Sequence, residues 1–268
     1  MGNRSARTFP ASAECYDRQI NWTARLGREI PFLTQVFGLP GRLGLLDAGC
    51  GSGRHAATLA ERGYRVTAAD ASTDMIRYAR RVAREQGVRV RLVRASFAEL
   101  PKKAGGPFDG VLCIGNSLPL AGSAPGVRSA VRSFARLLRP GGHLLIQVIN
   151  FARMHHELQH GGCVRGPHVL RSRGREYVSF KVFHAAGRQV TMTGVTLWKE
   201  AGAWKHEVFR GRLYPIDAAP LCRWLRAAGF RILKRLGSYV GEPYAAAHSP
   251  DLILICERTG NRRVSGGP

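Results

Sequence analysis

Residues 45–72 read LLDAGCGSGRHAATLAERGYRVTAADAS, and this stretch decides the fold. An apolar run leads into glycines at alternate positions, a helix-like segment follows, and a second apolar run ends at an aspartate. This order is typical of a buried strand, a tight turn, a helix and a second, parallel strand. Because ligands of an open α/β sheet lie beyond the carboxyl ends of its strands, the stretch also predicts a binding site at its glycines.

The spacing of these glycines indicates a nucleoside ligand. Gly49, Gly51 and Gly53 carry no Cβ atom, so the backbone can turn sharply and a ligand can approach it closely. Asp70 ends the second strand, where a carboxylate can accept hydrogen bonds from both ribose hydroxyls. A dinucleotide motif needs its third glycine at position 54, which is Arg54 here, and no G-K-[ST] phosphate motif follows. The pattern therefore favours a nucleoside over a dinucleotide or a triphosphate.

Strand-like and helix-like runs keep alternating over residues 44–149, which predicts a doubly wound, mostly parallel α/β sheet. Three β-rich runs within residues 177–214, separated by Ala-Gly pairs, predict an antiparallel cap that roofs the site. We expect a single domain. Its segments are a helical cover (1–40), a ligand-binding core (41–150), a β-rich insertion (151–214), a C-terminal helix and strands that complete the sheet (215–258), and a tail (259–268).

Composition excludes several classes of protein. The chain has 268 residues, of which 44% are hydrophobic, so it can form a packed core. Six cysteines without a C-x-x-C pair and nine histidines without a cluster predict neither a metal site nor a disulfide framework. No apolar run is long enough to cross a membrane, and we expect a cytoplasmic protein.

The formal charge of +23 is the most unusual bulk property. The basic residues are six lysines and 35 arginines, which are spread along most of the chain. Residues 76–96 carry seven arginines, but apolar residues at helical spacing alternate with them, as on a solvated helix face. We therefore favour a compositional bias at the surface, and keep an RNA-binding surface as the alternative.

The pattern D-x-G-x-G-x-G with an acid at the end of the next strand resembles motifs I and II of the class I S-adenosylmethionine-dependent methyltransferases. The segments FDGVLCIGNSLPL (108–120) and LLRPGGHLLIQVINFARM (137–154) are similar to the glycine and sarcosine N-methyltransferase-like branch. So are YDRQINWTARLGREIPFL near the N-terminus and SPDLILICER near the C-terminus. The resemblance implies S-adenosylmethionine as the cofactor and methyl transfer to a nitrogen or oxygen of a small molecule.

The resemblance also implies cofactor-binding roles for named residues. Arg25 would pair with the cofactor carboxylate, Tyr16 would close over the site, and Asp70 would hold the ribose. Ala71 and Met75 would pack on the adenine. The remaining implied cofactor residues lie in the glycine loop (Asp47, Gly49, Cys50, Gly51, Gly53), at the adenine edge (Ser96, Phe97) and near the sulfonium (Cys113, Ile114, Gly115).

The acceptor side is less clearly marked. Asn116, Asn150 and Arg175 are the substrate-binding candidates, and Asn150, His155 and His156 are the candidate bases. Both asparagines are equally suited to cap turns at strand ends. The branch usually has tyrosine and aspartate where this chain has Phe151 and Ala152, which argues against a glycine-like acceptor.

Two other functions stay open at this point. The basic surface would suit an RNA methyltransferase, although no appended RNA-binding module is recognisable. A non-catalytic protein that binds S-adenosylmethionine or another nucleoside on the same fold is the second alternative. The sequence predicts no oligomeric state.

Overall fold

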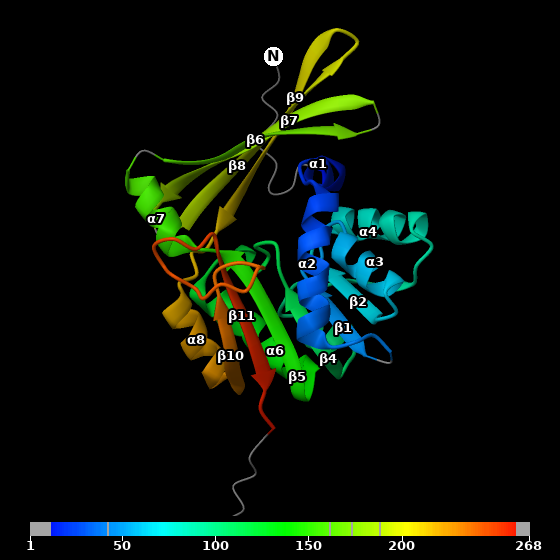
Figure 1. The fold of residues 1–268 in the computed structure, drawn as a ribbon, viewed down its shortest axis with the longest axis vertical. Helices are drawn as coiled ribbons and strands as arrows, with labels where there is room; N and C mark the ends of the chain where they lie inside the picture. The colour runs from blue at the N-terminus through cyan, green and yellow to red at the C-terminus, as the bar shows by residue number, and fades with distance from the viewer. Residues whose placement is uncertain (1–11, 42, 161, 173, 188, 261–268) are drawn as a thin grey trace, which may run out of the picture.

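The computed structural model describes residues 12–41, 43–160, 162–172, 174–187 and 189–260. They form a seven-stranded sheet flanked by helices, with a separate four-stranded sheet standing over one end of it (Figure 1). Most of the predicted tail (259–268) lies outside the described residues. The predicted division into segments stays a prediction.

The large sheet has the strand order β10-β11-β5-β4-β1-β2-β3. Neighbours from β3 to β5 pair in parallel, whereas β11 pairs antiparallel with both β5 and β10. The strands are β1 Gly44–Ala48, β2 Arg65–Asp70, β3 Val90–Arg94, β4 Phe108–Cys113, β5 Leu138–Ile149, β10 Phe230–Leu236 and β11 Asp251–Arg258. The predicted mostly parallel α/β sheet is confirmed.

Helices cover both faces of this sheet because its buried strands are apolar on both sides. Leu45 packs into a core with α2 and α3, while the adjacent Leu46 packs into a second core with α6 and α8. Leu144 and Leu145 divide between the two cores in the same way. The helices are α1 Ala13–Arg18, α2 Trp22–Phe37, α3 Arg54–Glu61, α4 Thr73–Glu85, α5 Leu100–Lys103, the 3₁₀ helix η1 Leu118–Ala121, α6 Ala124–Leu137, α7 Phe151–Gln159 and α8 Ala218–Ala227.

The small sheet, called the cap below, is an antiparallel meander of four strands in the order β6-β7-β8-β9. Its strands are β6 Cys163–Ser172, β7 Arg175–Ala186, β8 Gln189–Glu200 and β9 Ala203–Leu213. The three predicted strands are confirmed as β7, β8 and β9, whereas β6 was missed, because Gly166-Pro167 interrupts its pattern and the pairing register shifts there. A proline is tolerated because β6 is an edge strand.

The short helix α1 joins the cap to the body. Toward the body, Asp17 accepts hydrogen bonds from Arg54 Nη2 at 2.6 Å and from the Tyr78 hydroxyl at 2.7 Å. Toward the cap, Gln19 Nε2 donates to Thr196 Oγ1 at 2.7 Å. Arg54, which stands where a dinucleotide motif has glycine, therefore anchors the helical cover.

Membrane-spanning helices, metal-ligand groups and cysteine pairing were assessed over the residues that the structure describes. No helix there is long and apolar enough to span a membrane. No group of three or more potential metal ligands was found in the same ranges. All six cysteines are free and buried.

Candidate functional site

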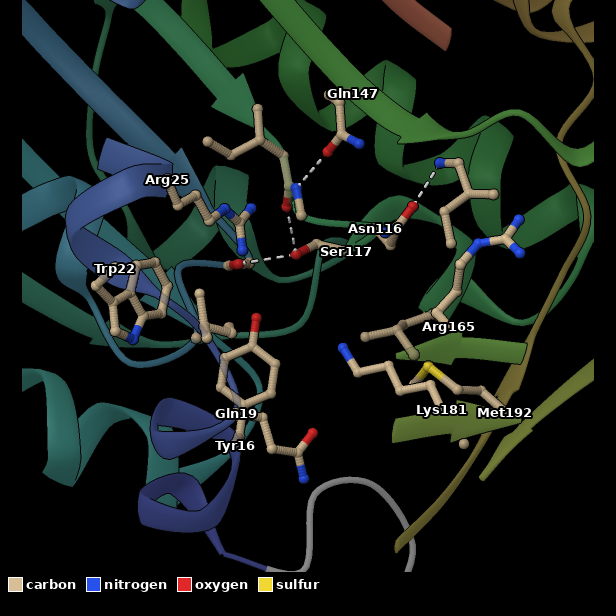
Figure 2. Close-up of a pocket in the computed structure, with 18 of the residues that line it drawn as sticks. Tyr16, Gln19, Trp22, Arg25, Asn116, Ser117, Gln147, Arg165, Lys181 and Met192 are labelled. Carbon is tan, nitrogen blue, oxygen red and sulfur yellow. Dashed lines mark hydrogen bonds between the residues drawn. The ribbon is translucent and has the colours of Figure 1, made fainter. Parts of the chain in front are cut away.

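A cavity of about 1650 Å³ lies between the carboxyl ends of the central strands, helices α1 and α2, and the cap (Figure 2). Its floor comes from the loops after β1, β2 and β4, and its roof from β6, β7, β8 and β9. Ligand pockets usually measure about 300–1,000 Å³. The cavity is therefore large enough for two ligands at once.

The three motif glycines all have left-handed backbone angles, with φ of +82° at Gly49, +54° at Gly51 and +77° at Gly53. A Cβ atom at Gly49 would lie 2.6 Å from the Ser117 Cβ, and one at Gly53 would lie 2.6 Å from the Ala79 Cβ. Gly49 and Gly51 line the cavity, whereas Gly53 packs against α4 and does not. Close protein packing, and not ligand approach, thus requires the third glycine.

Asp70 borders the cavity at the end of β2 and fixes the glycine loop. Its Oδ2 accepts a hydrogen bond from the Gly51 amide at 3.0 Å, and its Oδ1 accepts one from the Ser72 amide at 2.8 Å. Burial raises the pKa of this carboxyl group, and the backbone donors oppose the shift. The side chain therefore presents its remaining acceptor positions at the rim where the sequence predicts a ribose.

Asp47 lines the same floor and is only 2% exposed. Its Oδ2 is buried and has no hydrogen-bond partner among the described residues. Burial, assisted by the nearby Asp70, raises its pKa to about 7. An unpaired buried carboxyl group is costly, so this one is suited to a cationic or hydrogen-bond-donating ligand.

Arg25 reaches the cavity from α2, and Glu29 of the same helix holds its side chain in place. Its Nε donates to Glu29 Oε1 and Oε2 at 3.0 and 3.1 Å, and His55 Nε2 lies 2.7 Å from Glu29 Oε2. Burial opposes ionisation of Glu29, but His55 and Arg25 together lower its pKa. Arg25 Nη2 lies 3.0 Å from where a Cβ of Gly115 would stand, so the guanidinium faces the loop after β4.

The loop after β4 is held by hydrogen bonds to β5 and to the glycine loop. The Gly115 amide donates to Gln147 Oε1 at 2.7 Å, and the Ile149 amide donates to Asn116 Oδ1 at 2.5 Å. The Ser117 hydroxyl lies 2.9 Å from the Gly49 carbonyl oxygen. Asn116 lines the cavity but uses its side-chain oxygen to fix the end of β5.

The structure brings most of the predicted cofactor residues to one cavity. Those that line it are Tyr16, Arg25, Asp47, Gly49, Cys50, Gly51, Asp70, Ala71, Met75, Ile114 and Gly115. Three others besides Gly53 do not. Cys113 is fully buried in the core, Ser96 donates to Glu99 at 2.8 Å, and Phe97 packs edge-on against Phe134.

The acceptor-side candidates, except Asn116, lie away from the cavity. Asn150 is 1% exposed and caps α7, and its amide donates to the Ala246 and Ser249 carbonyl oxygens at 2.9 and 2.8 Å. His156 is exposed on α7 and stacks on His160, and His155 is not among the lining residues. Arg175 forms an ion pair with Glu200 at 2.6 Å. None of these four residues lines the cavity, and their roles as base or substrate ligands stay predictions.

Several polar residues of the cavity were not predicted. Gln147 and Tyr239 line it from the body and Gln19 from α1, while Lys181 projects from the cap (Figure 2). Gln147 could have been found as the polar residue in the apolar run HLLIQVI, and Lys181 as a lysine in an arginine-rich chain. No sequence signal marks Tyr239.

Comparisons with known proteins point to one activity. Residues 45–142 match a family model described as a methyltransferase domain. The cypemycin N-terminal methyltransferase of a Streptomyces species is 30% identical over 217 residues, which cover 80% of this chain and 82% of that protein. The glycine/sarcosine N-methyltransferase of Parasynechococcus marenigrum (strain WH8102) is 27% identical over 229 residues, which cover 84% of this chain and 76% of that protein.

A solved structure shares the same fold. The S-adenosylmethionine-bound CalS10, an amino pentose methyltransferase from Micromonospora echinaspora, superposes with a TM-score of 0.69 and 22% sequence identity. The match covers 96% of this chain and 100% of that chain. The similarity therefore extends over the cap as well as the sheet.

Proposed function

Since the chain belongs to the class I S-adenosylmethionine-dependent methyltransferases, we propose that it methylates a nitrogen or oxygen atom of a small molecule held beneath the cap. S-adenosylmethionine is the methyl donor of this family. The observation that carries the proposal is the single cavity that joins the glycine loop to the underside of the cap. It offers one end to a nucleoside and the other to an acceptor.

The residues of the floor fit S-adenosylmethionine chemically. The unpaired Oδ2 of Asp47 suits the ammonium group of the methionine moiety, and the Arg25 guanidinium suits its carboxylate. Asp70 suits the ribose hydroxyls, because backbone donors already orient its carboxylate. The Met75 side chain at the cavity edge suits the flat face of the adenine.

When bound, the cofactor would supply a methyl group on a sulfonium sulfur; the acceptor atom bonds to the methyl carbon in line as the carbon–sulfur bond breaks, and neutral S-adenosylhomocysteine leaves. The protein holds the two reactants in line and keeps water away, which can lower the barrier by about 7–11 kcal/mol. The cap roofs the cavity, and Tyr16 lies between its two ends. No base among Asn150, His155 and His156 is required by this scheme.

Six free, buried cysteines among the described residues favour a reducing compartment. We accordingly propose the cytoplasm as the location.

The proposal is tested by cofactor binding and methyl transfer. Calorimetry should show micromolar binding of S-adenosylhomocysteine to the wild-type protein. Asp70→Asn should weaken this binding by about 100-fold, since hydrogen bonds to a charged group are worth about 1.5–3 kcal/mol each. Glu61→Gln is the matched control, because this exposed carboxylate at the end of α3 lies outside the cavity.

The wild-type protein should also transfer labelled methyl groups to compounds in a metabolite extract. Absence of cofactor binding would overturn the proposal. Binding without transfer to any compound would favour a non-catalytic protein instead. Equal affinities of wild type and Asp70→Asn would show that the ribose is held elsewhere.

A further inference from the structure

We propose that Lys181 binds an anionic group of the methyl acceptor, a carboxylate or a phosphate, and so selects anionic small molecules. This inference rests on the proposed function, because it takes the cap side of the cavity as the acceptor site. It goes further by naming the substrate class and the residue that recognises it.

The position of Lys181 in the cap directs its side chain toward the body. It lies on β7 between Ser179 and Phe183, which share its face of the strand and are both buried. Figure 2 shows the Lys181 side chain extending from the cap into the cavity, across from Arg25. The sheet therefore holds a primary amine over the space between the glycine loop and the roof.

The neighbours of Lys181 across the sheet provide no counter-charge. Its partner on β6 is Arg165, and its partner on β8 is Gly194. The Phe209 ring of β9 lies over Gly194, because a Cβ there would be 2.2 Å from the Phe209 Cε1. The row across the cap thus consists of a cation, the lysine, a glycine and an aromatic ring.

The acids near the cavity have other partners or lie on the cofactor side. Glu157 pairs with Arg153 and Arg165 at 2.9 and 2.6 Å. Glu29 is shared by Arg25, Arg28 and His55, and Asp251 accepts from Gln147. Asp47 in β1 and Asp70 at the end of β2 lie beside the glycine loop, on the cofactor side. Lys181 has no hydrogen bond or ion pair with any described residue.

Apart from the paired Glu29, the titratable side chains that line the cavity from the cap, α1 and α2 are cationic or neutral. They include Arg165 and His168 from β6, Arg210 and Arg212 from β9, Arg25 from α2 and Tyr16 from α1. Burial, assisted by Arg25, lowers the pKa of Lys181 to about 8, as expected for a cation without a counter-ion. An acceptor molecule with a positive charge would be repelled here, whereas the carboxylate or phosphate of an anionic acceptor would neutralise the excess positive charge.

The first experiment tests anion binding without requiring activity. The full-length protein, saturated with S-adenosylhomocysteine, is treated with formaldehyde and cyanoborohydride at pH 8, and the modification rate of each lysine is followed by mass spectrometry. Sodium acetate or inorganic phosphate should slow modification of Lys181 several-fold, because the bound anion keeps the amine protonated. Tetramethylammonium chloride at equal ionic strength, which has no N–H and does not consume formaldehyde, should have no effect, and the exposed Lys234 serves as the internal control.

Some outcomes of this experiment distinguish the two anions, and others would overturn the proposal. Stronger protection by acetate indicates a carboxylate acceptor, and stronger protection by phosphate indicates a phosphorylated one. If adding S-adenosylhomocysteine to a parallel cofactor-free sample protects Lys181 by itself, the cofactor carboxylate is the counter-ion and the proposal is overturned. No protection by either anion would also contradict the proposal.

The second experiment uses the acceptors found in the metabolite extract. Each should carry a carboxylate or phosphate, and Lys181→Met should raise their KM roughly 10- to 100-fold, since a charged hydrogen bond is lost. Lys181→Arg should restore most of the loss, and both variants should bind S-adenosylhomocysteine within about two-fold of wild type. A neutral acceptor, or an unchanged KM, would overturn the assignment. If no compound is methylated, the proposed function fails, and the modification experiment still decides the role of Lys181.

Discussion

Asp47 is a cavity residue that lowers the stability of the cofactor-free protein and is suited to bind a ligand. Its carboxyl group is 2% exposed, and Oδ2 is buried without a partner, so ionisation in the cofactor-free protein is unfavourable. The neighbouring Asp70 adds to the effect, and the pKa reaches about 7. Such costs are characteristic of binding sites, where a ligand supplies the missing partner.

The raised pKa of Asp47 predicts a pH-dependent effect of Asp47→Asn. The folded protein keeps the proton up to about pH 7, whereas the unfolded chain loses it near pH 3.8, so this contribution to stability falls as the pH rises between these values. At pH 8 the cofactor-free Asp47→Asn variant should therefore exceed wild type by roughly 2–4 kcal/mol in free energy of unfolding. At pH 4 the difference should nearly vanish. Urea unfolding at both pH values measures it.

Asp109→Asn is the control with the opposite sign. Burial opposes ionisation of Asp109, but the Gly44 amide and Arg139 outweigh it and lower the pKa. Its contribution to stability is present above the unfolded pKa and is lost in acid, so this variant should be less stable than wild type at pH 8. Equal stability of Asp47→Asn and wild type at pH 8 would contradict the unpaired state of Asp47.

Among the elements, α1 contributes most to the site relative to its length. It has six residues, too few to be stable alone, so it depends on tertiary contacts. The Ala13 amide donates to Asp74, Asp17 accepts from Arg54 and Tyr78, and Gln19 donates to Thr196 of the cap. The helix therefore places Tyr16 at the cavity while it joins the cap to α3 and α4.

Removing the Asp17 carboxylate should detach α1 from the body. Asp17→Ala leaves Arg54 and the Tyr78 hydroxyl without their acceptor, which should cost about 1–3 kcal/mol. Hydrogen exchange should increase over residues 13–18, and S-adenosylhomocysteine should bind about 10-fold more weakly, a factor that corresponds to about 1.4 kcal/mol. Arg77→Ala removes an exposed ion pair within α4 and should change stability by less than about 0.5 kcal/mol. Unchanged exchange in Asp17→Ala would contradict the anchoring role.

At the scale of the whole molecule, one group of arginines lies away from the cavity. A second hollow lies at the amino ends of β1, β2 and β3, and its lining includes Arg65, Arg80, Arg84, Arg89 and Arg91. The methyl-transfer cavity lies at the carboxyl ends of the same parallel strands. A polyanion held at the basic hollow would therefore lie at the opposite end of the sheet from the cofactor residues.

This separation predicts how the protein should behave with RNA. A mixed-sequence single-stranded RNA should bind in 50 mM salt through the net charge of +23 and dissociate as salt is raised to about 300 mM. The double substitution Arg84→Glu and Arg89→Glu should weaken RNA binding while S-adenosylhomocysteine affinity stays unchanged. Fluorescence anisotropy of labelled RNA at several salt concentrations measures RNA binding, and calorimetry measures the affinity for S-adenosylhomocysteine. Transfer of labelled methyl groups to the RNA would instead revive the RNA methyltransferase alternative.

Local patterns in the sequence predict the sheet and the glycine loop, because apolar runs form buried strands and glycines mark left-handed turns such as those at Gly49 and Gly51. The methyl donor followed from the resemblance of this loop and of Asp70 to the methyltransferase motifs. The fourth cap strand was missed because a proline broke its pattern. The roles of Asn150 and Arg175 stay predictions, because sequence cannot tell a capping asparagine from a catalytic one, or a paired arginine from a free one; the structure shows Asn150 capping α7 and Arg175 paired with Glu200.

Which side chains share the cavity follows from the three-dimensional fold. Asp47 and Lys181 lie far apart in the chain, and each becomes distinctive only because folding places it in the cavity, Asp47 buried and Lys181 half-buried, without an ion-pair partner among the described residues. Burial and pairing are properties of three-dimensional neighbourhoods, and a local pattern does not encode them. The sequence therefore identifies the methyl donor, whereas the inference of an anionic acceptor depends on the folded cap.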